Sequence, residues 1–299
     1  MKFGIRIPPP QMGPIGDPDF VIRYSKLVES LGFESIWVID HALMCIAYDS
    51  TYPYKTTGRT PIPAEANMPD PLVLMTWIAA ATERLRLGTS MLILPQRHPI
   101  LLAKEIATLD RYSKGRVTLG VGVGWVKEEV EILKQDFGDR GRRANEWIAV
   151  LRALWFEGPS EFTGDYYQFK DIASYPKPVQ AGGIPIMIGG HSAAAAVRAG
   201  RYGDEFYPHW STRGPNEEAL EELLSVIAVS AEESGRSPSE VRLTLTSTSD
   251  AKTAYATAEL CARLGAERVV VLPPKGELDG ALPAELMRFK QTVIDQFLD

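Results

Sequence analysis

Short apolar runs alternate with longer helical runs from one end of the chain to the other. Several short runs are apolar at consecutive positions, as expected of strands that are covered on both faces. The eight strand candidates are FGIRI (3–7), SIWVID (35–40), LRLGTSMLIL (85–94), VTLGVGV (117–123), IPIMIGG (184–190), DEFYPHW (204–210), VRLTLTS (241–247) and RVVVLP (268–273). The predicted helices cover 18–32, 71–83, 100–113, 127–137, 142–156, 192–203, 216–235, 253–265 and 283–298.

This uninterrupted series of strand and helix units predicts a single α/β domain over residues 1–299, a (β/α)8 barrel of the TIM type. An open doubly wound sheet is the competing layout, since it uses the same alternation. In a barrel, the loops that follow the strands converge at one face and build the active site there. Candidate residues are therefore sought at the carboxyl ends of the strands.

Two insertions interrupt the simple alternation. The segment 42–69 is too long for an ordinary strand-to-helix loop and carries three tyrosines, so we expect a lid or a wall of the binding site. The run EFTGDYYQFKDI (161–172) predicts a short hairpin that turns at Gly164 and Asp165. Two interpretations of this hairpin remain: it is a surface feature without a role in function, or it forms part of the site.

Composition narrows the class of partner. Lys and Arg total 32 against 38 Asp and Glu, a net charge of -6, and the charges are interspersed without basic clusters, which argues against nucleic acid. No run resembles a signal peptide or a membrane span. Two distant cysteines exclude a disulfide framework and indicate a reducing cytoplasm. The four histidines have no metal-ligand spacing, so no metal is expected.

Asp40 ends the second strand candidate and His41 follows it. Two adjacent ionisable groups are unfavourable in the apolar surroundings of a buried strand, which points to a functional role. A carboxylate beside an imidazole favours the protonated imidazole and suits general acid–base catalysis. A loop histidine with a satisfied hydrogen bond is the alternative explanation.

The run GVGVGW (120–125) contains alternating glycines but lacks the third glycine of a dinucleotide fingerprint. Glycines at alternate strand positions leave one face without side chains, so a flat ring can lie against the backbone. Tight packing inside the barrel explains the same pattern equally well.

The run IGGHSAAAAVRAGRYGD (188–204) ends a strand in two glycines and starts a helix at Ser192. The first helical turn contains only alanines, although helix starts normally attract Asp or Glu. An open helix N-terminus of this kind binds phosphate in many barrels. We predict a phosphate site here, with simple helix capping as the alternative.

Four stretches together resemble the luciferase-like monooxygenase superfamily of flavin and deazaflavin enzymes, and most closely its coenzyme F420-dependent oxidoreductases. The stretches are DH (40–41), LGTSMLILPQRHPILLAKEIATLDRYSKGRVTLGVGVGW (87–125), RGRRANEWIAVLRALW (140–155) and IPIMIGGHSAAAAVRAGRYGD (184–204). The resemblance implies a bacterial luciferase-like barrel that carries a tricyclic ring at the strand ends. It also implies a cis peptide between Ser90 and Met91 and a homodimer.

The resemblance implies roles for individual residues. His41 would be catalytic. The residues expected to bind the cofactor, F420 or alternatively FMN, are Asp40, Thr89, Ser90, Met91, Gly122, Val123, Gly124, Gly189, Gly190, His191 and Ser192. Those expected to contact a small-molecule substrate are Trp125, Tyr207, His209 and Trp210.

One departure from the family pattern bears on the substrate. In the sugar-phosphate dehydrogenases of this family a glutamate follows the glycine run, whereas this chain has Trp125. An indole favours an apolar or aromatic substrate. The sequence thus predicts hydride transfer between a deazaflavin and such a substrate, with an FMN-dependent monooxygenase and a non-catalytic cofactor-binding protein as alternatives.

Overall fold

The structure is a computed structural model that describes residues 1–156, 158–208 and 216–297. Its main sheet is a closed barrel of parallel strands, because β1 pairs with β2 on one side and with β11 on the other. The order around the barrel is β1, β2, β3 with β4, β5, β8, β9, β10 and β11. The predicted (β/α)8 barrel is therefore confirmed, and the open sheet is excluded.

The strands are β1 (Lys2–Arg6), β2 (Ser35–Val38), β3 (Arg86–Thr89), β4 (Leu92–Ile93), β5 (Val117–Gly122), β8 (Ile186–Gly189), β9 (Glu205–Tyr207), β10 (Arg242–Ser247) and β11 (Arg268–Val271). The short pair β3 and β4 together occupies the third position, since both pair with β5. The α-helices are α1 (Pro18–Ser30), α2 (Pro71–Ala81), α3 (Pro99–Tyr112), α4 (Lys127–Ile132), α5 (Arg140–Trp155), α6 (Ala193–Tyr202), α7 (Glu217–Glu233), α8 (Ala251–Arg263) and α9 (Leu282–Thr292).

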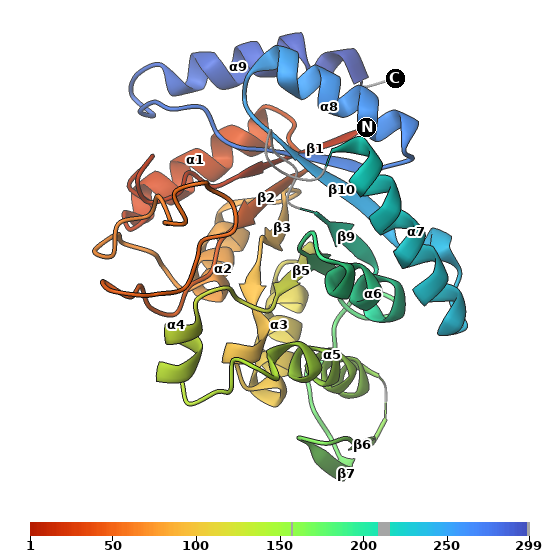
Figure 1. Cartoon of the computed structure of the whole chain (residues 1–299). Helices are drawn as coiled ribbons and strands as arrows, with labels where there is room; N and C mark the ends of the chain where they lie inside the picture. Colours follow the sequence, from red (N-terminus) through yellow and green to blue (C-terminus); the bar gives the residue numbers. More distant parts are fainter. Residues whose placement is uncertain (157, 209–215, 298–299) are drawn as a thin grey trace.

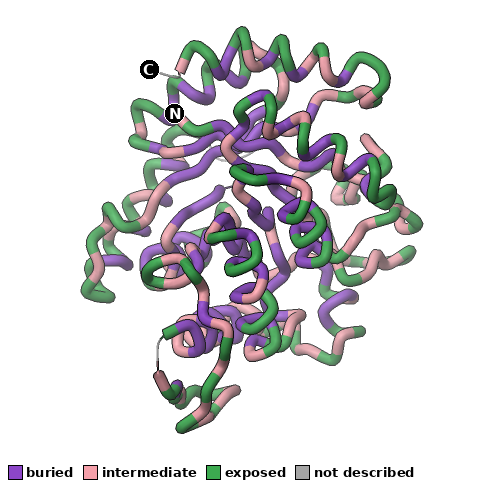
Figure 2. The backbone as a smooth tube through the Cα atoms, turned by 180° about the vertical axis from the view of Figure 1, so that it is seen from behind, coloured by how far each residue is buried: buried purple, intermediate pink, exposed green. Residues whose placement is uncertain are grey.

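The helices surround the strands, and Figure 1 shows the two ends of the chain meeting beside α8 and α9. The amino group of Met1 donates to the carbonyl of Phe297 at 3.4 Å. Buried positions concentrate on the strands and on the helix faces turned toward them (Figure 2). Within the described ranges, no helix has both the length and the apolar character that a membrane span requires.

The strand predicted at 85–94 is divided into β3 and β4, and two predicted helices are shorter than expected. α4 ends at Ile132 instead of continuing to 137, because Lys134 takes a left-handed backbone conformation with φ of 59°. The final helix breaks at Val293, and a short 3₁₀ helix follows at Ile294–Phe297. The predicted hairpin is confirmed as β6 (Ser160–Thr163) and β7 (Gln168–Ile172), and it projects away from the barrel in Figure 1.

The barrel interior is filled by Trp37, whose ring occupies space that glycines leave on neighbouring strands. A Cβ atom on Gly88 would lie 2.3 Å from the indole, and one on Gly4 would lie 2.6 Å from its Nε1 atom. Below this ring, Arg268 donates to Glu205 at 2.5 Å and to Glu34 at 2.8 Å. This ion-pair cluster closes the amino end of the barrel and leaves the carboxyl end for the site.

Candidate active site

His41 follows β2 at the carboxyl end of the barrel, and its ring is held by a carboxylate from a distant helix. His41 Nδ1 lies 2.8 Å from Oε2 of Glu129, in α4. The Glu129 carboxylate is almost completely buried, with 1% of its side chain exposed. An ionised carboxylate only accepts hydrogen bonds, so Nδ1 carries the proton and Nε2 of a neutral ring is left as an acceptor.

Glu129 also fixes the chain around His41. Its Oε1 atom accepts from the backbone N–H of Ala42 at 2.8 Å and of Leu43 at 3.3 Å. One buried carboxylate thus sets both the imidazole and the start of the loop that follows it.

The Asp40 carboxylate was expected to lie beside the His41 imidazole, but it forms its hydrogen bonds elsewhere. Its carboxylate accepts from the backbone N–H of Ile93 at 2.9 Å and from the Arg97 guanidinium at 3.0 Å. Burial raises the pKa of Asp40, and the positive charge of Arg97 opposes that rise. The carboxylate that contacts His41 is Glu129, because Asp40 points toward β4 and anchors it.

The long loop 42–69 forms an aromatic wall across the site. The Trp125 ring makes edge contacts with Tyr48, Tyr52 and His41, at centroid distances of 5.7, 5.1 and 6.1 Å. Tyr54 continues the row, since its ring lies 5.3 Å from that of Tyr52 and 5.7 Å from that of His191. Trp125 and these three tyrosines make up the aromatic wall.

Glu128, the neighbour of Glu129, ties the same loop to α4. It accepts from the hydroxyl of Ser50 at 2.6 Å and from the N–H groups of Asp49 and Ser50 at 2.6 and 3.1 Å. These hydrogen bonds, the one from the Ser50 hydroxyl first, lower the pKa of Glu128 to about 2. Figure 1 shows the orange loop running beside α4.

The anchoring of the loop by Glu128 should weaken in acid. The pKa of Glu128 in the folded protein lies below the ordinary value of 4.5. The stabilisation that its hydrogen bonds give to the loop is therefore present above pH 4.5 and is lost as the pH falls toward about 2. We expect the exchange protection of the Asp49 and Ser50 amides to fall over this range. The Ile7 amide, bonded to Trp37 inside the barrel, serves as the control. Unchanged protection at Asp49 and Ser50 would contradict the assignment.

The segment between β3 and β4 matches the expected backbone, because the peptide bond from Ser90 to Met91 is cis. Thr89 differs from expectation. Its side chain is fully buried and its hydroxyl donates to the carbonyl of Gly120 at 2.6 Å. Thr89 therefore belongs to the barrel wall, whereas Met91 is half-buried at the rim.

Close packing accounts for most of the glycine run of β5. A Cβ atom on Gly120 would lie 1.9 Å from the Thr89 carbonyl oxygen, and one on Gly122 would lie 3.2 Å from the Cβ of Met91. Met91 likewise covers Gly189, where a Cβ atom would lie 2.4 Å from its side chain. Gly124 takes a φ of 79°, and its carbonyl accepts from Arg140 at 3.3 Å. Met91 therefore covers both Gly122 and Gly189. Val123 is half-buried.

The start of α6 has the open geometry that the alanines predict. Ser192 caps the helix by accepting from the N–H of Ala195 at 3.2 Å. Gly190, at φ of 126°, turns the chain between β8 and the helix, and its N–H donates to the carbonyl of Tyr207. Ala193 and Ala194 are exposed, and no acidic residue stands in the first turn. The helix N-terminus is therefore accessible to an anion.

Tyr207, at the end of β9, is buried, with 7% of its surface exposed. Its ring stacks on Trp37 with centroids 6.3 Å apart, and its hydroxyl accepts from Thr246 at 2.8 Å. Burial raises the pKa of Tyr207. His209 and Trp210, also predicted to contact substrate, lie outside the described residues.

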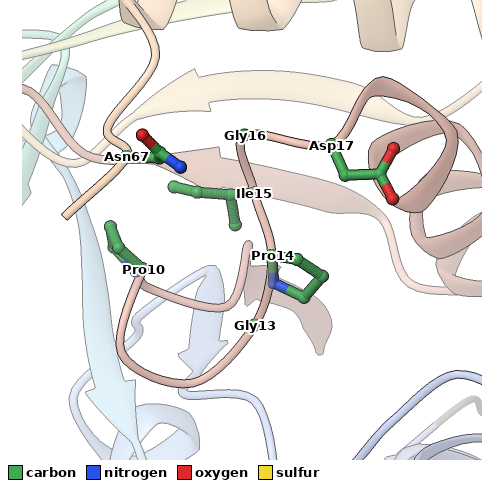
Figure 3. Close-up of a pocket in the computed structure, with 7 residues that line it drawn as sticks. All are labelled: Pro10, Gly13, Pro14, Ile15, Gly16, Asp17 and Asn67. Atoms are coloured by element: carbon green, nitrogen blue, oxygen red, sulfur yellow. The ribbon is translucent and has the colours of Figure 1, made fainter.

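Two hollows among the described residues lie away from His41. One of about 310 Å³ is lined by Pro10, by 13–17 and by Asn67 of the long loop. Figure 3 shows Asn67 beside Ile15, with Asp17 turned toward α1, which it caps. The other, of about 490 Å³, lies between the loops at the amino end of the barrel. None of the predicted site residues lines either hollow.

The sequence reasoning missed Glu129 and Arg6. Glu129 sits in KEEVEI, where acidic residues at a helix start are normally explained by the helix dipole. The preceding run GVGVGW indicated that this region belongs to the site, but only the fold brings α4 against the loop after β2. Arg6 was hidden inside the first strand, FGIRI, although a charged residue within an apolar strand was a usable signal.

Comparison with known proteins agrees with this arrangement. A family model described as luciferase-like monooxygenase matches residues 1–261. The F420-dependent glucose-6-phosphate dehydrogenase of Amycolatopsis mediterranei is 32% identical over 210 residues, which cover 69% of this chain and 56% of that protein.

Two solved structures have the same fold. The monooxygenase RslO1 from Streptomyces bottropensis has a TM-score of 0.79 at 20% identity, covering 99% of this chain and 100% of that one. The coenzyme F420-dependent tetrahydromethanopterin reductase from Methanopyrus kandleri has a TM-score of 0.74 at 19% identity, covering 99% of each chain.

Proposed function

Because the chain belongs to the luciferase-like monooxygenase family and is an oxidoreductase, we propose that it is coenzyme F420-dependent and transfers a hydride to or from an organic substrate. The observation that carries the proposal is the His41–Glu129 pair at the strand ends, which faces the ring of Trp125. A single ordered proton-transfer group beside an apolar wall suits hydride chemistry, in which one proton accompanies each hydride.

The residues at the rim fit a cofactor that carries a phosphate. The open start of α6, between Gly190 and Ala194, offers backbone N–H groups and the positive end of a helix dipole. Gly190, at φ of 126°, lets the chain turn between β8 and the helix start, while the space beside Gly189 is filled by Met91. Met91 would contact the ring, and Asp40 would act indirectly by holding β4 in position. When bound, the deazaflavin supplies the carbon that gives or accepts the hydride.

The chain's own residues then have separate tasks. His41 holds or accepts a proton at Nε2, since Glu129 occupies Nδ1. Glu129 is a positioning residue that acts through His41. The aromatic wall excludes water from the region between His41 and His191 and orients a flat substrate.

The substrate class follows from Trp125. The relative from Amycolatopsis is named a glucose-6-phosphate dehydrogenase, but a sugar phosphate needs polar partners where this chain has an indole edge against Tyr48 and Tyr52. We therefore assign an apolar or aromatic small molecule as substrate.

An FMN-dependent monooxygenase is the second candidate, supported by the likeness in fold to RslO1, which is named a monooxygenase. An isoalloxazine and a deazaflavin are similar flat rings, and both cofactors carry a phosphate that the start of α6 suits. Spectral titration separates the two, because each cofactor has its own visible absorption. Tight uptake of FMN with no response to F420 would remove the leading proposal.

The phosphate site is tested in the same titration. Replacing the exposed Ala193 by aspartate adds a negative charge to the first turn of α6, and we expect the cofactor Kd to rise about 10-fold. Ala193→Asn is the matched control, since it has the same shape without the charge. Equal affinity of the two variants would show that the phosphate binds elsewhere.

We also propose that the protein is cytoplasmic and forms a homodimer. Both cysteines, Cys45 and Cys261, are free thiols, which supports a cytoplasmic location. A homodimer is expected from the family resemblance alone, and sedimentation would test it.

A further inference from the structure

Arg6 occupies the interior of the barrel at its carboxyl end. Side chains alternate along a strand, and Gly4 faces the Trp37 ring inside the barrel, so Arg6 two residues later faces inward as well. From the end of β1 its Nη2 atom reaches across β2 and donates to the carbonyl of Ser90 at 3.3 Å. The guanidinium therefore lies at the rim, above Trp37.

This guanidinium has fewer acceptors than comparable arginines in the described part of the chain. Arg6 is half-buried and makes one long hydrogen bond, with no carboxylate among its partners. Each of the other arginines that are buried or half-buried contacts at least two acceptors. These are Arg86, Arg97, Arg116, Arg140, Arg143, Arg152, Arg198, Arg236, Arg242 and Arg268.

A partly desolvated guanidinium with one long hydrogen bond keeps most of its N–H donors unsatisfied, and a ligand with acceptor oxygens satisfies them. The planar guanidinium fork matches two oxygens of one carboxylate or an enolate oxygen.

The positive charge of Arg6 acts on three tyrosines of the site. The phenols of Tyr52 and Tyr54 are partly buried, which raises their pKa values, and the nearby positive charge of Arg6 opposes the rise in each. Tyr207, stacked on Trp37 below, is affected by Arg6 in the same way. A single cation among flat apolar surfaces suits an aromatic or apolar molecule with one anionic group.

We propose that Arg6 binds the carboxylate or enolate oxygen of the substrate, so that the enzyme acts on an anionic aromatic or apolar molecule. This inference rests on the proposed oxidoreductase site. The barrel order separates Arg6 from the cofactor's phosphate, because β1 and β8 stand four positions apart in the ring of eight. In contrast, β1 and β2 are neighbours, so Arg6 and His41 flank one place at the rim.

The test uses calorimetry on the protein without any cofactor. Aryl carboxylates such as 1-naphthylacetate are compared with their neutral amides. We expect the wild type to prefer the carboxylate about 10- to 100-fold, and Arg6→Gln to remove that preference. Arg6→Lys keeps the positive charge without the planar guanidinium and should retain part of the preference for the carboxylate. The wild-type comparison of acid with amide does not depend on any variant folding.

Several results would overturn the inference. These are equal binding of acid and amide by the wild type, binding of neither at millimolar concentration, and an unchanged preference in a folded Arg6→Gln variant. Weakened F420 or FMN binding in Arg6→Gln with an unchanged carboxylate preference would assign the charge to the cofactor instead. Failure to bind F420 with a clear carboxylate preference would remove the hydride-transfer proposal and leave the role of Arg6 intact.

Discussion

Replacing His41 by glutamine is expected to lower turnover by about 10²- to 10⁴-fold, the usual contribution of a general acid or base. Glutamine can still form a hydrogen bond but cannot transfer a proton at neutral pH. Because the imidazole is set apart from the start of α6, the cofactor Kd should change little. The measurement is kcat with F420 and substrate, together with the absorption titration of the cofactor.

Glu129→Gln is the informative partner of this variant. The amide oxygen of glutamine can still accept from Ala42 and Leu43, so the loop should remain in place. The charge next to Nδ1 is lost, and we expect a smaller decrease in kcat and a shift in its pH profile. Full activity of His41→Gln would exclude the imidazole as the proton-transfer group. Loss of cofactor binding on replacement of His41, together with no measurable activity in the unsubstituted protein, would favour a storage protein.

Gly120→Ala is expected to destabilise the barrel strongly, since the contact made by the added methyl is the shortest found at any glycine of the described residues. The added methyl would lie 1.9 Å from the backbone oxygen of Thr89 and 2.8 Å from the Met187 side chain, and the backbone of a closed barrel cannot move away without disturbing its neighbours. Overpacking of this kind costs about 3 kcal/mol or more when backbone atoms must shift. Urea denaturation monitored by circular dichroism measures the free energy of unfolding.

Gly280→Ala is the matched control for that experiment. Gly280 is exposed, and a methyl there meets only Glu277 atoms at 3.6 Å or beyond. We expect its free energy of unfolding to change by less than about 0.5 kcal/mol. Similar stability of the two variants would mean that β5 is not packed as tightly as its glycines indicate.

The sequence alone predicted a parallel α/β fold and the strand ends that carry the site, while closure of the sheet into a barrel was decided by the structure. Consecutive apolar positions in the strands, with helices between them, leave few arrangements in which every strand is covered on both faces. The sequence also predicted the open start of α6, because an alanine-only first turn after two glycines depends only on neighbouring residues. The hairpin at 160–172 and the loop over the site followed from the same short-range signals.

Only the tertiary structure decided which side chains meet. His41 and Glu129 are 88 positions apart, and the carboxylate of the adjacent Asp40 is engaged instead by Ile93 and Arg97, which the fold brings beside it. The alternation of side chains along β1 directs Arg6 inward, where closure of the barrel surrounds it with residues from distant strands. Thr89 looked like a rim residue but supports the wall, since its depth depends on how β3 packs against β5. Partners and depth are properties of the closed barrel, and no local pattern encodes them.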